Sequence, residues 1–190
     1  MRKVFFTNRK KVSNFEKVIE NLEKNSAIII REYDLPKKDR KDFAKKIFAI
    51  ARKRRDLKIL IGKDFALARE LKADGIHFSD FDKLPLHFLN KKSQPKNFLF
   101  SFSCHNFKSL LRAKKLKADM TFLSPIFPTT SHIGAKTFGL RNLAKIAIQN
   151  KKRDYIFGDI YALGGITKEN LKIIKKLPLR GFGAIDYFSK

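Results

Sequence analysis

Two histidines stand at or just beyond the ends of short apolar runs, and an imidazole is the side chain best suited to proton transfer near neutral pH. His77 lies within the run Gly75–Phe78, and His105 closely follows the run Phe98–Phe102. Either ring could act as an acid or base, or could hydrogen-bond a phosphate group. A single histidine can equally be a structural residue whose hydrogen bonds are satisfied within the fold. His77 and His105 are therefore candidate catalytic residues with a structural alternative.

Glycines near the end of the chain suggest a second kind of chemistry, the binding of an anion. Gly164 and Gly165 follow the apolar run Ile160–Leu163, and Gly183 lies in the last run, Gly181–Ala184. Glycine lets the backbone approach a ligand closely, and N–H groups at the start of a helix can point at an anion. Tight turns also need glycine, so a phosphate site and a plain turn are both open interpretations.

The segment 123–136, LSPIFPTTSHIGAK, holds a single Lys in a chain that contains 43 Lys and Arg residues. Pro125 and Pro128 favour extended backbone, while 129–131 supplies three hydroxyl groups. One interpretation is a long connection that needs turn residues. The other is a lid that closes over an anionic substrate, with Gly134 as its hinge.

The apolar pattern predicts the scaffold that positions these residues. Short β-rich runs predict eight strands, at Val4–Thr7, Ala27–Arg31, Lys58–Ile61, Gly75–Phe78, Phe98–Phe102, Met120–Leu123, Ile160–Leu163 and Gly181–Ala184. Segments with apolar residues three and four apart predict seven helices, at Ser13–Lys24, Pro36–Arg55, Asp64–Lys72, Leu84–Lys91, Asn106–Lys117, Leu140–Asn150 and Thr167–Lys176. Ser13 and Glu16 have the spacing of a capping box at the start of the first helix.

Alternation of this kind predicts parallel strands joined by right-handed crossovers. The expected fold is α/β, a compact single-domain (β/α)8 TIM barrel with short loops over residues 1–190. No linker, fixed-period repeat or low-complexity tract suggests a second domain. Active sites of this fold lie at the carboxyl ends of the strands. We therefore expect Arg31, Ser103, Thr129 and Gly165 to surround one hollow.

Composition narrows the class of protein. Hydrophobic residues make up 43% of the chain and include 19 Phe, enough for one core. Apolar runs such as Ala27–Ile30 are far shorter than the ~20 residues of a membrane helix, and the first residues show no signal-peptide pattern. Cys104 is the single cysteine, without a disulfide partner or metal-binding spacing, and is expected to be a small buried side chain. These features predict a cytoplasmic protein without a membrane segment.

The formal net charge of +25 would attract phosphates of nucleic acid or of small substrates. Lys and Arg recur in every segment that looks helical, which favours a solvated surface over a dedicated nucleic-acid face. The one dense cluster is 52–55, Arg-Lys-Arg-Arg, at the end of a predicted helix where cations favour the dipole. Small phosphorylated substrates are thus the expected partners, with nucleic acid as an alternative, and the sequence specifies no oligomeric state.

Several stretches taken together resemble one family. They are ADGIHFSD (73–80), FSCHNFKSLLRAKKLKADMTFLSPIFPTT (102–130), GAKTFGL (134–140) and ALGGITKENL (162–171). The chain is similar to the thiamine phosphate synthase / TenI family in its order and spacing over nearly its whole length. The resemblance implies a TIM barrel of thiamine biosynthesis that joins hydroxymethylpyrimidine diphosphate to thiazole phosphate, releasing pyrophosphate with the help of Mg²⁺. It also implies that 123–136 is a substrate loop.

The resemblance assigns roles to individual residues. Arg31 matches an Arg that contacts pyrophosphate, Asp82 a metal ligand, and Ser103 a Ser near the reacting groups. Thr129 and Ser131 match hydroxyl residues of the loop, His132 stands at the place of a loop Lys, and Gly164 and Gly165 match the turn that binds the thiazole phosphate.

Other positions depart from the family pattern. Ile29 and Tyr33 replace polar residues of strand two, Gly62 and Lys63 replace an Asn-Asp pair whose Asp binds Mg²⁺, and Asp186 replaces a small Ser beside the thiazole phosphate. An ammonium group can replace part of the charge of a metal but cannot coordinate one. The TenI branch offers thiazole tautomerisation instead, but its catalytic histidine falls at Pro125, so His105 or His77 would have to serve. A non-catalytic barrel that binds phosphate or nucleic acid is a third possibility.

Overall fold

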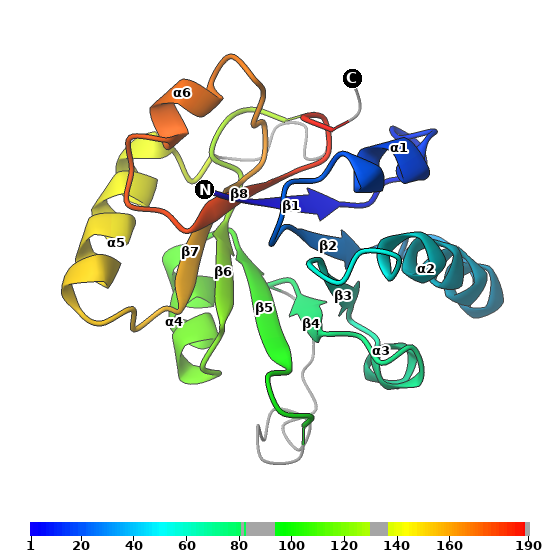
Figure 1. The fold of residues 1–190 in the computed structure, drawn as a ribbon. Helices are drawn as coiled ribbons and strands as arrows, with labels where there is room; N and C mark the ends of the chain where they lie inside the picture. The colour runs from blue at the N-terminus through cyan, green and yellow to red at the C-terminus, as the bar shows by residue number, and fades with distance from the viewer. Residues whose placement is uncertain (81, 83–93, 130–136, 189–190) are drawn as a thin grey trace.

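The computed structural model describes residues 1–80, 82, 94–129 and 137–188, and eight parallel strands in it close into a barrel (Figure 1). They are β1 (Arg2–Phe6), β2 (Ala27–Ile30), β3 (Lys58–Gly62), β4 (Gly75–Phe78), β5 (Leu99–Cys104), β6 (Met120–Leu123), β7 (Asp159–Leu163) and β8 (Gly181–Ala184). Each strand pairs with the next, and β1 also pairs with β8, so that Val4 stands opposite both Ala27 and Gly183. The predicted (β/α)8 barrel is confirmed.

Helices surround the barrel on its outer side (Figure 1). The described residues form α1 (Phe15–Glu20), α2 (Lys37–Ala51), α3 (Phe65–Glu70), α4 (Phe107–Lys115), α5 (Leu140–Lys152) and α6 (Leu171–Ile174). The predicted helix 84–91 lies outside the described residues. The predicted Ser13 cap is wrong, because the side chain of Asn14 accepts the hydrogen bond from the N–H of Lys17 at 2.9 Å. Helix α6 is much shorter than predicted, and turns replace its first residues.

Side chains of each strand alternate between the barrel interior and the helices. Phe6 and Ile29 point inward and join an interior cluster with Phe122 and Tyr161. Phe5 points outward and packs at 5.2 Å between ring centres against Phe188, on the helix side. Full burial of a side chain of this size contributes about 1.5–3 kcal/mol. Both faces of the strands are therefore covered, which explains why the strands read as continuous apolar runs.

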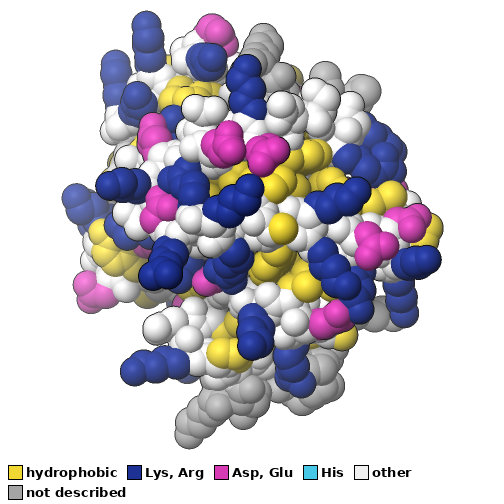
Figure 2. All heavy atoms as spheres, turned by 45° about the vertical axis from the view of Figure 1, so that its right-hand side comes forward, with side chains coloured by type: hydrophobic (Ala, Val, Ile, Leu, Met, Phe, Trp, Pro, Cys, Tyr) yellow, Lys and Arg dark blue, Asp and Glu magenta, His cyan; other side chains and the backbone are white. Residues whose placement is uncertain are grey.

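On the side of the molecule seen in Figure 2, the basic side chains do not form one continuous patch. Figure 2 shows Lys and Arg scattered over the visible side, with Asp and Glu among them. Two residues of the dense cluster 52–55 form ion pairs within the protein. Arg52 lies 3.0 Å from Asp74, and Arg54 lies 2.7 Å from Asp56. These ion pairs favour the solvated-surface interpretation of the charge. Within the described residues, no helix is long and apolar enough to cross a membrane.

Candidate active site

A cleft of about 1000 Å³ opens at the carboxyl ends of the strands. Each of the eight strands contributes to its lining, with Phe6, Arg31, Lys63, His77, Ser103, Ser124, Leu163 and Ala184 as one example from the end of each. Thr129 and Gly165 line it as well, so the four residues expected around one hollow do share it. Its volume reaches the upper range of small-molecule sites, enough for two small substrates.

The floor of the cleft contains a chain of three polar groups from β4 and β5. His77 places Nδ1 2.8 Å from the Ser101 hydroxyl and Nε2 3.1 Å from the Ser103 hydroxyl. Burial lowers the pKa of His77 to about 3, and the nearby charges of Arg31 and Lys63 act in the same direction. The ring is therefore neutral at physiological pH, with one nitrogen donating and the other accepting. His77 is thus suited to orient the Ser103 hydroxyl toward the cleft.

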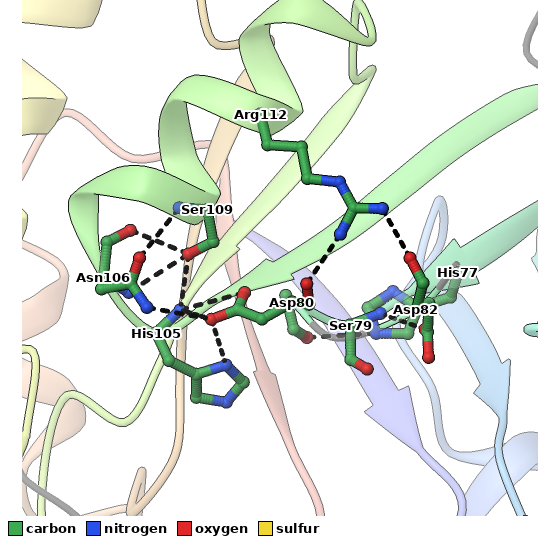
Figure 3. A network of polar contacts seen from close by, with 9 residues as sticks. His77, Ser79, Asp80, Asp82, His105, Asn106, Ser109 and Arg112 are labelled. Carbon is green, nitrogen blue, oxygen red and sulfur yellow. Dashed lines mark hydrogen bonds and ion pairs between the residues drawn. The ribbon is translucent and has the colours of Figure 1, made fainter. Parts of the chain in front are cut away.

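His105 lies at the rim, beside the buried carboxylate of Asp80 (Figure 3). Its Nδ1 is 3.2 Å from Oδ2 of Asp80, and its backbone N–H donates to the same oxygen at 3.0 Å. Asn106 caps α4 and contributes an amide contact to Asp80 at 3.4 Å. The carboxylate of Asp80, 4% exposed, thus holds the backbone of a histidine that lines the cleft and lies close to its ring. An Asp-His arrangement of this kind can move a proton.

Arg31 directs a cation into the cleft from the end of β2. Its Nε is buried without a hydrogen-bond partner, and its guanidinium carbon lies 5.7 Å from the centre of the Phe6 ring. Among the described residues no carboxylate forms an ion pair with Arg31. A buried donor without a partner is costly, and a bound anion would satisfy it.

Glu32 organises the backbone around Arg31. It is 5% exposed and has a φ of +26°, a strained value for a residue other than glycine. Its carboxylate accepts hydrogen bonds from the Thr7 hydroxyl at 2.6 Å and from the N–H groups of Arg9 and Arg31 at 3.2 Å. Burial raises the pKa of Glu32, while these hydrogen bonds act in the opposite direction. The sequence interpretation missed this residue, because its partners come from another strand end.

The Gly164-Gly165 turn supports the segment after β6. Its two residues have φ of +89° and +66°, and a Cβ on Gly165 would collide with the carbonyl oxygen of Pro128. The N–H groups of Ile126 and Phe127 donate to the carbonyls of Leu163 and Gly164 at 2.9 and 3.1 Å. The segment that begins with Ser124 is therefore fastened to the glycine turn, and both line the cleft.

Comparison with known proteins decides the family. The model of the family described as thiamine monophosphate synthase, TMP-TENI, matches residues 4–186. The chain belongs to this family. A protein of Aquifex aeolicus (strain VF5) named "Putative thiamine-phosphate synthase 2" is 34% identical over 185 residues, which cover 96% of this chain and 94% of that protein. A solved structure of thiamine phosphate pyrophosphorylase from Pyrococcus furiosus has a TM-score of 0.78 at 25% identity, covering 97% of this chain and 85% of that one.

A thiamine-phosphate synthase of Hydrogenobaculum sp. (strain Y04AAS1) is 25% identical over 184 residues, covering 96% of this chain and 80% of that protein. Membership of the TMP-TENI family thus extends over the whole barrel, including all of the strand ends that line the cleft. The residues that resemble the family pattern can therefore be located within its fold.

Two of the family-based assignments lie outside the described residues, Ser131 and His132. Gly183 is not among the residues that line the cleft, although Ala184 beside it is, and a phosphate contact at Gly183 stays a prediction. A Cβ at Gly183 would lie 2.5 Å from the Phe6 ring and 3.0 Å from the Phe122 ring, inside the barrel. These two rings leave no room for a side chain at this position. Cys104 is buried as expected, and burial raises the pKa of its thiol to about 12.

The donor set expected for Mg²⁺ does not fit the ion. Asp82, the matching ligand, has Oδ1 2.7 Å from the ammonium of Lys63 and Oδ2 2.6 Å from the N–H of Ser79. Mg²⁺ needs near-octahedral oxygen ligands, and an ammonium group offers no lone pair. Within the part of the chain that the structure describes, no group of three His, Cys, Asp or Glu residues could hold a metal.

Asp186, which replaces a small Ser of the family pattern, lies 2.8 Å from the ammonium of Lys11. This ion pair joins the loop after β1 to the end of β8, and both residues line the cleft. The negative charge of the carboxylate is therefore balanced at its own position. The sequence analysis did not identify Lys11 as a site residue, because its partner Asp186 lies 175 residues away along the chain. It did not identify Asp80 either.

Proposed function

We propose that this protein is a thiamine phosphate synthase-type transferase that joins hydroxymethylpyrimidine diphosphate to thiazole phosphate. The observation that carries the proposal is the shared cleft, in which Arg31 presents a buried guanidinium nitrogen without a partner and the Gly164-Gly165 turn presents backbone. Membership of the family described as thiamine monophosphate synthase supports the same reaction.

In the proposed reaction, the bond between the pyrimidine methylene carbon and the diphosphate oxygen breaks. The bonding electron pair leaves with pyrophosphate, and the nitrogen of the thiazole forms the new bond to carbon. Arg31 would hold the departing pyrophosphate, since a guanidinium suits two phosphate oxygens at once. The Ser103 hydroxyl, oriented by His77 at 3.1 Å, would contact the reacting groups. The glycine turn would bind the phosphate of the thiazole.

The test is to mix the purified protein with both phosphorylated substrates and to measure thiamine phosphate, in parallel with Mg²⁺ and with EDTA. Arg31→Ala should lower kcat/KM about 100-fold or more, the size expected for removing one charged contact to a leaving group. Arg180→Ala is the matched control, because Arg180 precedes β8 at the opposite end of the barrel and pairs with Asp159 at 3.3 Å. Absence of product above a blank in both conditions would end the proposal.

One observation favours a second candidate, a thiazole phosphate tautomerase. His105 lines the cleft, and its Nδ1 lies 3.2 Å from the buried Asp80 carboxylate, which places an acid–base pair beside the substrate site. The measurement is isomerisation of a thiazole phosphate by the wild type and by His105→Ala and His77→Ala. An unchanged rate in both variants would contradict this assignment.

A further inference from the structure

Three residues that depart from the family pattern contact one another at one corner of the cleft. The Tyr33 hydroxyl lies so close to Gly62 that any Cβ on Gly62 would collide with it. The ammonium of Lys63 lies 4.6 Å from the centre of the Tyr33 ring, a distance typical of cation–π contact. The three residues fit together. Gly62 has no Cβ and so leaves room for the side chain of Tyr33, and the Tyr33 ring contacts the ammonium of Lys63.

The backbone also directs Lys63 into the cleft. Lys63 has a φ of +62°, and its N–H donates to the carbonyl of His77 at 2.8 Å. A lysine in this left-handed conformation costs of order 1 kcal/mol, so the surrounding structure must hold it there. The Lys63 side chain lines the cleft, and Asp82 contacts its ammonium at 2.7 Å from below the surface, with 12% of the Asp82 side chain exposed.

Asp82 is itself fixed, as Figure 3 shows. One carboxylate oxygen accepts the N–H of Ser79 at 2.6 Å, and the backbone carbonyl of Asp82 accepts a hydrogen bond from Arg112. Arg112 also binds the carbonyl of Asp80 at 2.7 Å. The ion pair between Lys63 and Asp82 is therefore part of a network of polar contacts that reaches α4.

A charge count links this corner to the chemistry of a diphosphate. A divalent cation between two carboxylates has a net charge of zero, and so has one ammonium beside one carboxylate. Exchanging a carboxylate and its dication for a lysine therefore leaves the net charge of the corner unchanged. The ammonium still has three protons, so it can keep Asp82 and donate to a phosphate oxygen as well.

We infer that this corner binds the pyrophosphate group without a divalent metal, and that Lys63 supplies the cation. The identity of the ligand rests on the proposed transferase function. Lys63 and Arg31 together balance the charge that develops on the leaving group when its bond to the pyrimidine carbon breaks. Lys63 is thus assigned as a binding residue, and Tyr33 and Asp82 as the residues that position it.

The experiment is calorimetric titration of the full chain with inorganic pyrophosphate, in EDTA and in Mg²⁺. The wild type should bind pyrophosphate in EDTA, where no divalent cation is available. Lys63→Asn should weaken binding about tenfold or more, as expected for loss of one charge-assisted contact. Asn tolerates positive φ, so this variant keeps the backbone conformation. Lys58→Asn, at the opposite end of β3, is the matched control and should bind as the wild type does.

Lys63→Asp is the sharper variant, because it places a second carboxylate beside Asp82. It should lose binding in EDTA and recover it in Mg²⁺, and Mg²⁺ should raise its melting temperature but not that of the wild type. Pyrophosphate binding by the wild type that requires Mg²⁺, or that Lys63→Asn leaves intact, would overturn the inference. Formation of thiamine phosphate in Mg²⁺ but not in EDTA would overturn the inference of metal-free binding and would support the transferase function. Pyrophosphate binding that depends on Lys63 and needs no metal, without formation of thiamine phosphate in either buffer, would support the inference and contradict the transferase function.

Discussion

The Nε2 of His77 lies 3.1 Å from the hydroxyl of Ser103, and both groups lie at the floor of the cleft. His77 is 3% exposed, and its other nitrogen contacts Ser101 at 2.8 Å. Phe6 packs edge-on against the imidazole at 5.3 Å between ring centres. The ring is enclosed by apolar and hydroxyl groups, so it is held in the neutral form and fixes the direction of the Ser103 hydroxyl.

Replacing His77 with Asn should make the protein less sensitive to mild acid. Burial lowers the pKa of His77 to about 3, whereas the unfolded chain protonates near the ordinary value of 6.5. The stability of the wild type is therefore complete above pH 6.5 and is lost as the pH falls toward 3. Between pH 6.5 and 5 the free energy of unfolding should fall about 1.5 kcal/mol more in the wild type than in His77→Asn. Urea unfolding at the two pH values measures this difference, and equal losses in both proteins would contradict it.

Replacing Gly165 with Ala should damage the glycine turn. Gly165 has a φ of +66°, and the added Cβ would collide with the carbonyl oxygen of Pro128. The backbone conformation alone costs an alanine roughly 1–3 kcal/mol, and the segment after β6 must also move. We expect lower thermal stability together with about tenfold or greater loss of thiazole phosphate affinity, measured by calorimetry.

Gly139→Ala is the control for this substitution. Gly139 has a φ of +82°, but within the described residues nothing lies within 4 Å of the Cβ that the substitution adds. It should lose stability through its backbone conformation and keep its affinity for the thiazole phosphate. Equal loss of affinity in the two variants would show that the turn has no direct part in binding.

The strands could be predicted from the sequence because both of their faces are buried. The ranges Gly75–Phe78, Met120–Leu123 and Gly181–Ala184 agree with the structure at both ends. Helix ends were less predictable, since α6 retains Leu171–Ile174 of a predicted ten-residue segment. The cleft followed from the rule that sites lie at strand ends. The ion pairs in the cleft could not be predicted from the sequence. Lys63 and Lys11 meet their partners Asp82 and Asp186 because the barrel closes, and not because of their spacing along the chain.

Arg54 and Arg55 should differ in their effect on stability, although they are neighbours of the same type. The Arg54 guanidinium donates to the carbonyls of Ile19, Glu20 and Leu22 at the end of α1 and pairs with Asp56 at 2.7 Å. Removing it leaves those carbonyls without a charged donor. Arg54→Ala should lower the free energy of unfolding by about 1–3 kcal/mol.

Arg55→Ala should stay within about 0.5 kcal/mol of the wild type, as surface substitutions usually do. Arg55 is exposed, so the pair separates a structural arginine from a solvated one at constant change in net charge. Chemical unfolding of both variants is the measurement. Similar losses would mean that net charge, and not the contacts of Arg54, decides stability in this segment.

Replacing Thr7 with Val should cost more stability at higher pH. The Thr7 hydroxyl donates to Glu32 at 2.6 Å and accepts the N–H of Arg31 at 3.1 Å, and the substitution removes both contacts at nearly constant shape. Burial already raises the pKa of Glu32, so the stability that its neutral form provides is present at low pH and is lost as the pH rises through the folded pKa.

Without the Thr7 hydroxyl, the buried carboxylate of Glu32 loses a hydrogen-bond donor, and the pKa of Glu32 should rise further. We expect Thr7→Val to cost about 1–3 kcal/mol at pH 7.5 and clearly less at pH 5, measured by urea unfolding. In a Glu32→Gln background, which cannot titrate, the cost should be the same at both pH values, and a pH dependence that persists there would assign the effect to another group.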